Sequence, residues 1–198
     1  MSNKLLLFGG AFNPPHKGHM RLLNNAIETV KPELTIVMPT STSPHKESGD
    51  ISFHHRYMMA RVFKQFDNVK ISDIENRGRK RKNYTIGTLK WLEKRYKGYE
   101  IYLLIGSDML LSFKTWSRYK RILSKATLVV ASREKDDMEL KKAVEQLKKE
   151  GARIELISFT PLVISSSELR ESIKQGKDVD KYLEDSVREY IYTQCLYL

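Results

Sequence analysis

The stretch GGAFNPPHKGH, which begins at Gly9, combines residue types that suit phosphate binding. Gly9 and Gly10 have no Cβ, so the backbone can approach a bulky ligand closely. A helix that begins near His16 or Lys17 would offer unpaired N–H groups and a partial positive charge to a phosphate. His16 and His19 are three residues apart, so both fall on the same side of the first helical turn. We expect both histidines to point into the space above the two glycines.

The residues alone leave three other interpretations of this stretch open. Two glycines after a strand are common in turns, and two histidines at this spacing can be ordinary surface residues. The third is a zinc site, but the sequence has no H-E-x-x-H pattern and no cysteine besides Cys195 to complete the ligands. The glycine-rich fingerprint of dinucleotide binding and the Walker A pattern are both absent.

A second group with phosphate-binding chemistry lies about 150 residues later, in the stretch SSSELR. Serines at the start of a helix can cap it and bind phosphate oxygens, which applies here to Ser165, Ser166 and Ser167. Arg170 follows one turn later, where its guanidinium can make a two-pronged contact with a phosphate. The alternative is a surface helix capped by Ser166.

The elements that must position these groups alternate along the chain. Short apolar runs predict strands at 4–8, 34–38, 69–74, 101–105, 127–131 and 153–157. Helical periodicity follows the first loop up to Pro32, and further helices are predicted at 52–66, 85–96, 107–113, 117–124, 136–150, 166–175 and 179–193. Thr85 is the expected N-cap of its helix.

Strands that are apolar throughout and separated by helices indicate an α/β fold with a doubly wound parallel sheet. In such sheets the ligand binds beyond the carboxyl ends of the strands. Both phosphate-binding stretches directly follow predicted strands, so we expect them to meet at that edge.

Bulk composition sets further limits. The 198 residues carry 35 basic and 24 acidic side chains, a formal net charge of +11 that favours anionic partners. No apolar run approaches the length of a membrane span, and we expect no membrane partner. With one cysteine and no signal-peptide core, the expected location is the cytoplasm.

The two stretches resemble the signatures of the nucleotidylyltransferase superfamily. His16-Lys17-Gly18-His19 is similar to its H-x-G-H element, and ISSSELR, which begins at Ile164, is similar to its I-S-S-T-x-x-R element. The longer form GGxFxPxH resembles bacterial nicotinate-nucleotide adenylyltransferases. The resemblance implies a Rossmann-like fold, with residues 1–198 as one nucleotidylyltransferase domain and a small helical part from about residue 166.

The middle of the chain adds weaker resemblances to the same family. PTSTSPHK resembles a loop in which Lys46 would be a phosphate ligand, and Arg56 matches an arginine at the start of the following helix. The alternatives are an ordinary polar loop and a solvated helix charge. Tyr84 and Thr85 resemble a Y-T-x-x-T-L element that contacts the pyridine carboxylate, although Gly87 stands where the family usually has Asp.

A further element, G-x-D…W, is matched by Gly106, Asp108 and Trp116. The resemblance implies that Asp108 binds ribose hydroxyls and that Trp116 stacks on the nicotinate ring, although a tryptophan is more often a core residue. Arg133 matches a nearby family arginine.

The implied reaction joins nicotinate mononucleotide to the AMP part of ATP and releases pyrophosphate. Mg²⁺ would be bound to ATP rather than to a set of protein ligands. The expected catalytic residues are His16, His19, Lys46 and Arg170. The expected ATP-binding residues are Gly9, Gly10, Phe12, His16, His19, Gly106, Asp108, Ser165, Ser166 and Arg170. The expected acceptor-binding residues are Asn13, Lys46, Tyr84, Thr85, Trp116 and Arg133.

Two alternative functions remain from the sequence. One is another adenylyltransferase, with nicotinamide mononucleotide or phosphopantetheine as the acceptor. The other is a nucleic-acid-binding protein, because residues 77–82 form the dense basic run RGRKRK. Such a run without interleaved aromatic residues is usually a solvated loop.

Overall fold

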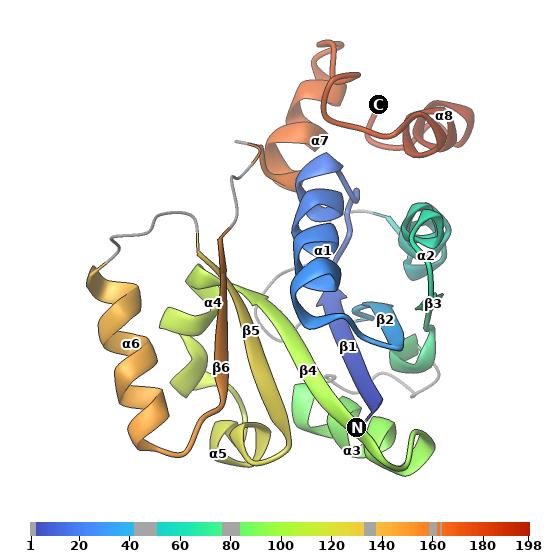
Figure 1. Ribbon diagram of the computed structural model, residues 1–198. Coiled ribbons are helices and arrows are strands. Elements are labelled where there is room, and N and C mark those ends of the chain that lie inside the picture. Colours follow the sequence, from blue (N-terminus) through green and yellow to red (C-terminus); the bar gives the residue numbers. More distant parts are fainter. Residues whose placement is uncertain (1–2, 42–50, 77–83, 133–137, 159–161, 163) are drawn as a thin grey trace.

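The computed structural model describes residues 3–41, 51–76, 84–132, 138–158, 162 and 164–198. A six-stranded sheet runs through the molecule in the order β3-β2-β1-β4-β5-β6, and every strand pair is parallel (Figure 1). The strands are β1 (Asn3–Gly10), β2 (Leu34–Pro39), β3 (Val69–Ile71), β4 (Tyr99–Gly106), β5 (Ala126–Ser132) and β6 (Ile154–Ser158). The predicted doubly wound α/β fold is confirmed, with its switch point between β1 and β4.

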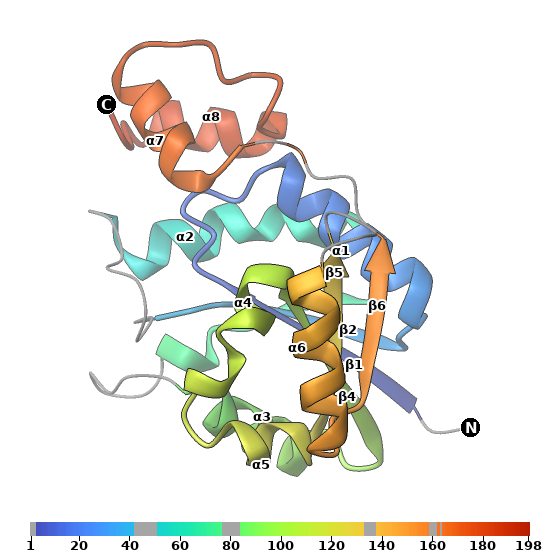
Figure 2. The ribbon, with the colours of Figure 1, turned by 90° about the vertical axis from the view of Figure 1, so that its left-hand side faces the viewer.

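The apolar runs of the strands are continuous because both faces of the sheet are covered. In β1, Leu5 and Leu7 belong to one hydrophobic cluster, whereas Leu6 and Phe8 belong to another. The first cluster lies under α3 (Thr85–Arg95), α4 (Ser107–Leu111), α5 (Tyr119–Leu123) and α6 (Met138–Lys149). The second lies under α1 (Lys17–Val30), α2 (Phe53–Ala60) and the 3₁₀ helix η1 (Arg61–Gln65) (Figures 1 and 2).

The C-terminal helices α7 (Ser166–Lys174) and α8 (Asp185–Thr193) lie beyond the carboxyl end of the sheet (Figure 1). They enclose a third hydrophobic cluster, which includes Met59 of α2. His55 of α2 also contacts Tyr190 of α8, with 3.0 Å between the Nδ1 atom and the hydroxyl oxygen. This helical part is therefore packed directly onto the edge of the sheet where the ligand was expected. No helix in the described ranges is long and apolar enough to cross a membrane.

Several predicted boundaries were wrong. The single helix expected at 52–66 changes from α2 into η1 at Arg61. The third strand ends at Ile71 rather than 74, and the 3₁₀ helix η2 (Ile74–Asn76) follows it. β3 is an edge strand with one pairing neighbour, so fewer ladder hydrogen bonds extend it.

Helix starts also differ from the predictions. Tyr84, not Thr85, is the N-cap of α3, and α8 begins at Asp185 rather than 179. Ser165 caps α7: its Oγ accepts the N–H of Glu168 at 3.1 Å, while its own N–H donates to the Glu168 carboxylate at 2.7 Å. This reciprocal pair satisfies two backbone donors, which leaves the Ser166 hydroxyl available for another contact.

Candidate active site

The loop between β1 and α1 is built around a buried phenylalanine. Phe12 has a left-handed backbone conformation (φ 48°) and is 1 % exposed. Its ring centroid lies 5.2 Å from that of Phe8 and 5.0 Å from that of Phe63. Phe12 was expected to bind ATP, but its side chain is in the core, so only its backbone is left for a ligand.

Both glycines were expected to make room for a ligand, but the space beside Gly10 is taken by a side chain of the protein. A Cβ at Gly10 would lie 2.9 Å from the Phe12 ring, so the missing side chain makes room for this phenylalanine. At Gly9 the nearest atom to such a Cβ is the Met38 carbonyl oxygen at 4.0 Å. The space above Gly9 is therefore the part of the expected opening that remains.

His16 and His19 lie next to each other, as expected for residues on the same side of the first turn. Their ring centroids are 3.8 Å apart, and the His16 backbone N–H donates to Nδ1 of His19 at 3.3 Å. Because Nδ1 accepts this bond, the neutral His19 ring carries its proton on Nε2 and can donate there. A Cβ at Gly18 would lie 2.9 Å from the His16 ring, so glycine at this position permits the close pair.

His16 is 8 % exposed, and burial lowers its pKa to about 4. The ring is therefore neutral at pH 7. Its Nδ1 atom is buried and has no hydrogen-bond partner among the described residues. Buried polar atoms in native proteins nearly always have a partner, so this nitrogen is a candidate contact for a bound ligand.

The start of α1 is less open than expected. The N–H of Lys17, which is the first residue of the helix, donates to the Tyr182 carbonyl oxygen at 2.8 Å. The C-terminal helical part thus takes one of the donors that the sequence assigned to a phosphate. A ligand at this helix start must use the donors that remain.

The two distant signatures meet at the loop of Asn13 and Pro14. Nη1 of Arg170 donates to the Asn13 carbonyl oxygen at 2.8 Å, and Nη2 donates to Oγ of Ser167 at 3.2 Å. The Ser166 hydroxyl donates to the Pro14 carbonyl oxygen at 2.9 Å. The predicted meeting of the first loop with SSSELR at the carboxyl edge is confirmed. The contacts are made to Asn13 and Pro14, which precede His16 in the loop.

Arg56 was considered only as a family match or a solvated charge, and the second interpretation was wrong. It is 2 % exposed, and its guanidinium donates to the carbonyl oxygens of Ala11 at 2.9 Å, Thr40 at 2.6 Å and Ser41 at 3.1 Å. Burial lowers its pKa, although an arginine in protein stays charged. Arg56 therefore joins the loops that follow β1 and β2, which no local pattern in the sequence reveals.

Glu75 is a second residue that the sequence reasoning missed. Its Oε1 accepts a hydrogen bond from the Thr88 hydroxyl at 2.9 Å. Burial raises the pKa of Glu75, while Thr88, Ser41 and Arg56 act in the opposite direction. Thr88 belongs to the tyrosine–threonine element of the sequence, so this buried carboxyl group connects that element to the loops that Arg56 holds.

The remaining expected residues with a described position follow β4 or lie at the start of α3. A Cβ at Gly106 would lie 2.6 Å from Oδ1 of Asp108, so these two residues pack closely after β4. The Trp116 ring packs on Phe113 at 5.0 Å between centroids and adjoins the core. Tyr84 and Thr85 form the start of α3, where Tyr84 is 44 % exposed. Lys46 and Arg133 lie outside the described residues.

The assembled groups suit an anion. Imidazole N–H groups, guanidinium groups and backbone amides donate hydrogen bonds, which phosphate oxygens accept. In the described ranges, no three His, Cys, Asp or Glu side chains are grouped so that they could hold a metal ion. Mg²⁺ that is bound to a polyphosphate needs no such group, because the phosphate oxygens serve as its ligands.

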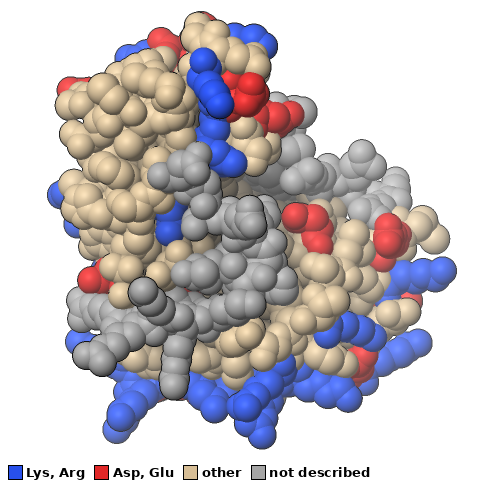
Figure 3. All heavy atoms as spheres, turned by 180° about the vertical axis from the view of Figure 1, so that it is seen from behind, with Lys and Arg blue, Asp and Glu red and all other residues tan. Residues whose placement is uncertain are grey.

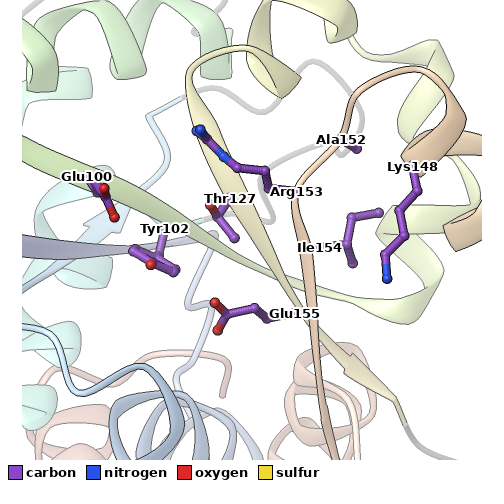
Figure 4. Close-up of a pocket in the computed structure, with 8 residues that line it drawn as sticks. All are labelled: Glu100, Tyr102, Thr127, Lys148, Ala152, Arg153, Ile154 and Glu155. Atoms are coloured by element: carbon purple, nitrogen blue, oxygen red, sulfur yellow. The ribbon is translucent and has the colours of Figure 1, made fainter.

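A cavity of about 420 Å³ lies elsewhere, at the amino ends of β4, β5 and β6 (Figure 4). Its lining mixes acidic Glu100 and Glu155 with basic Lys148 and Arg153. Basic side chains also gather along the edge of the molecule where α3 and α5 lie (Figure 3). Neither feature lies at the carboxyl edge that holds the histidines.

This fold and this pair of joined loops define a nucleotidyl-transferring site, and the chain belongs to the cytidylyltransferase-like family, whose model matches residues 7–172. It is 34 % identical over 199 residues to a protein of Lachnoclostridium phytofermentans named probable nicotinate-nucleotide adenylyltransferase, covering 98 % of this chain and 99 % of that protein. A protein of Thermosipho melanesiensis with the same name is 32 % identical over 194 residues, covering 96 % of this chain and 95 % of that protein.

A solved structure shows the same fold. It is described as Plasmodium falciparum nicotinic acid mononucleotide adenylyltransferase complexed with NaAD. The two chains are 21 % identical, the TM-score is 0.81, and the match covers 98 % of this chain and 97 % of that chain.

Proposed function

We propose that this protein is a nicotinate-nucleotide adenylyltransferase, which transfers the AMP part of ATP to nicotinate mononucleotide and forms nicotinate adenine dinucleotide. The observation that carries this proposal is the contact of Arg170 with Asn13, which joins the two signature stretches beside the histidine pair. The family and the nearly full-length relatives of the same name support it.

In the reaction, an oxygen of the mononucleotide phosphate forms a bond to the α-phosphorus of ATP. The bond from that phosphorus to its bridging oxygen breaks, and pyrophosphate leaves with the electron pair. The second pKa of a phosphate monoester is near 6, so the attacking group is already largely deprotonated at pH 7. The reaction therefore needs positioning and charge stabilisation rather than a general base.

The residues of this chain have distinct parts in that scheme. His19, with its proton on Nε2, donates to a phosphate oxygen whose charge grows in the transition state. Neutral His16 adds a second imidazole contact, and Arg170 places a guanidinium beside the polyphosphate. Lys46 is part of the proposal as a further phosphate ligand. Mg²⁺ bound to ATP would neutralise part of the triphosphate charge.

The acceptor is the part of the proposal that rests on Tyr84, Thr85 and Trp116. The start of α3 would contact the pyridine carboxylate, and Trp116 would stack on the ring. Asn13 and Arg133 are further acceptor contacts in this proposal, whereas Gly106 and Asp108 belong to the ATP side. The single cysteine, Cys195, which leaves no intramolecular disulfide, supports a cytoplasmic location.

A pyrophosphate-release assay tests the function and the acceptor together. Purified protein with ATP and Mg²⁺ receives nicotinate mononucleotide, nicotinamide mononucleotide or phosphopantetheine in separate reactions. We expect the highest kcat/KM with nicotinate mononucleotide. Equal or faster turnover with another acceptor would overturn the assignment of the acceptor. If no pyrophosphate is released with any of the three acceptors and the protein binds RNA or DNA in a salt-dependent way, the assignment as an adenylyltransferase would be overturned.

A further inference from the structure

The segment after α8 returns to the active site. The chain turns at Cys195 and Tyr197, which both have left-handed backbone conformations (φ 49° and 62°). The buried side chain of Leu196 anchors this turn in the third hydrophobic cluster, and its N–H donates to the Ile191 carbonyl oxygen at 2.9 Å. As a result, the Tyr197 hydroxyl reaches a residue 184 positions earlier and donates to Oδ1 of Asn13.

Asn13 is thereby held from two directions by the C-terminal part. Arg170 donates to its carbonyl oxygen, and Tyr197 donates to its side-chain oxygen. Asn13 itself is 4 % exposed. Because Oδ1 accepts the hydrogen bond from Tyr197, the N–H groups of the side-chain amide point away from the phenol.

The electrostatic surroundings of Tyr197 suit a donor. Burial raises the pKa of its phenol, while the nearby charges of Arg170 and Arg56 lower it. The net direction is upward, so the hydroxyl keeps its proton at neutral pH. A neutral phenol near two arginines can donate to Asn13 without adding a negative charge to a site that must accept phosphates.

We propose that Tyr197 is a positioning residue of the active site, which acts through Asn13 on the loop that carries His16 and His19. The proposal rests on the adenylyl transfer proposed above. The proposal gives residues 195–198 a part in catalysis, although they belong to neither of the two signature stretches. The physical basis is that a small displacement of a phosphate-binding loop weakens every contact that the loop makes in the transition state.

The first test compares Tyr197→Phe with Tyr192→Phe in the full chain. Tyr197→Phe keeps the ring and removes the hydroxyl, so we expect kcat to fall about 5- to 20-fold, as for the loss of one buried hydrogen bond. Tyr192 lies in the last turn of α8 and is 47 % exposed, and its variant is expected to keep the kcat of the parent protein. Thermal unfolding of both variants controls for loss of the fold.

A double-mutant cycle with Asn13→Ala separates positioning from general stability. If Tyr197 acts through Asn13, Tyr197→Phe has no additional effect on kcat in the Asn13→Ala background. Independent effects that multiply would overturn the proposal, as would a Tyr197→Phe variant with the kcat of Tyr192→Phe. Pyrophosphate release by the parent protein is measured in parallel, so failure of the adenylyl transfer itself is seen separately.

Hydrogen exchange gives a readout that does not depend on turnover. We expect the amides of Ala11, Phe12, Asn13 and His16 to exchange faster in Tyr197→Phe than in the parent protein, while amides of β4 stay equally protected. Unchanged exchange at these four amides would contradict the inferred positioning of the loop by Tyr197.

Discussion

The two ends of the sheet hold different kinds of polar groups. At the carboxyl end, His16, Arg56 and Asn13 are buried. The Arg56 guanidinium donates to backbone carbonyl oxygens of two loops, and Asn13 accepts hydrogen bonds from Arg170 and Tyr197. At the amino end, the cavity of about 420 Å³ is lined by side chains such as Glu155 and Arg153, which come from one short stretch of β6 and its approach. The amino end has this hollow, but the buried side chains His16, Arg56 and Asn13 lie at the other end.

The difference shows that burial of polar groups, rather than the presence of a hollow alone, marks the site in this molecule. Burying a polar or charged group is costly unless it has partners, so a protein keeps such groups where they have a task. The orphaned Nδ1 of His16 and the buried guanidinium of Arg56 meet that criterion. Opposite charges at the rim of the amino-end cavity are ordinary for a protein surface.

The largest expected effect is a difference in kcat between variants at the carboxyl end and the amino end of the sheet. His19→Ala is expected to lower kcat at least about 100-fold, because it removes a donor that acts in the transition state. Glu155→Gln in the cavity is expected to leave kcat within about twofold of the parent value. Steady-state pyrophosphate release measures both. Near-normal turnover of His19→Ala, or a large loss in Glu155→Gln, would reverse the functional ranking of the two ends.

A second comparison concerns stability. Arg56→Met removes three hydrogen bonds to backbone carbonyl groups and is expected to lower the free energy of unfolding by about 3 kcal/mol. Arg153→Met changes an exposed arginine at the cavity and is expected to cost less than about 0.5 kcal/mol. Urea unfolding curves of the two variants test this difference. Equal losses would show that Arg56 contributes no more than a surface residue.

The buried imidazole gives the carboxyl end a pH dependence. The ordinary pKa of histidine is about 6.5, and burial lowers that of His16 to about 4. Between these two pH values, His16 is protonated in the unfolded chain and neutral in the folded chain. The free energy of unfolding therefore keeps its full value above pH 6.5 and falls by up to about 3 kcal/mol as the pH decreases to 4.

Urea unfolding of the parent protein and of His16→Gln between pH 4 and 7 isolates this contribution. Glutamine does not titrate, so the variant is expected to lose less stability over that range than the parent protein. Parallel pH profiles for the two proteins would contradict the inferred burial of a neutral His16.

The smallest expected effect concerns the start of α3. A Cβ at Gly87 meets no atom within 4 Å, and the residue is exposed in the first turn of the helix. Gly87→Asp adds helix propensity and a negative charge near the helix N-terminus, so we expect a gain of about 1 kcal/mol in stability. A rise in Tm measures the gain. A lower Tm would mean that glycine is needed here for a contact that the backbone alone provides.

Much of the fold was predictable because it depends on local periodicity. Each predicted strand is present, and the order of strands and helices identified the doubly wound sheet and its carboxyl edge. Helix boundaries were less accurate at 52–66 and 179–193, because tertiary packing rather than periodicity decides where a helix ends. Ser165 and Ser166 are equally good capping residues in sequence, and only the contact with Pro14 distinguishes their roles.

By itself, the sequence determined which stretches carry phosphate chemistry and that both follow strands, since residue types and spacing are local properties. Only the tertiary structure decided that Gly10 makes room for Phe12, that Arg56 is buried between two loops, and that Tyr197 holds Asn13. These features depend on contacts between residues far apart in the chain. No periodicity or motif encodes such contacts, because burial is a property of the packed molecule as a whole.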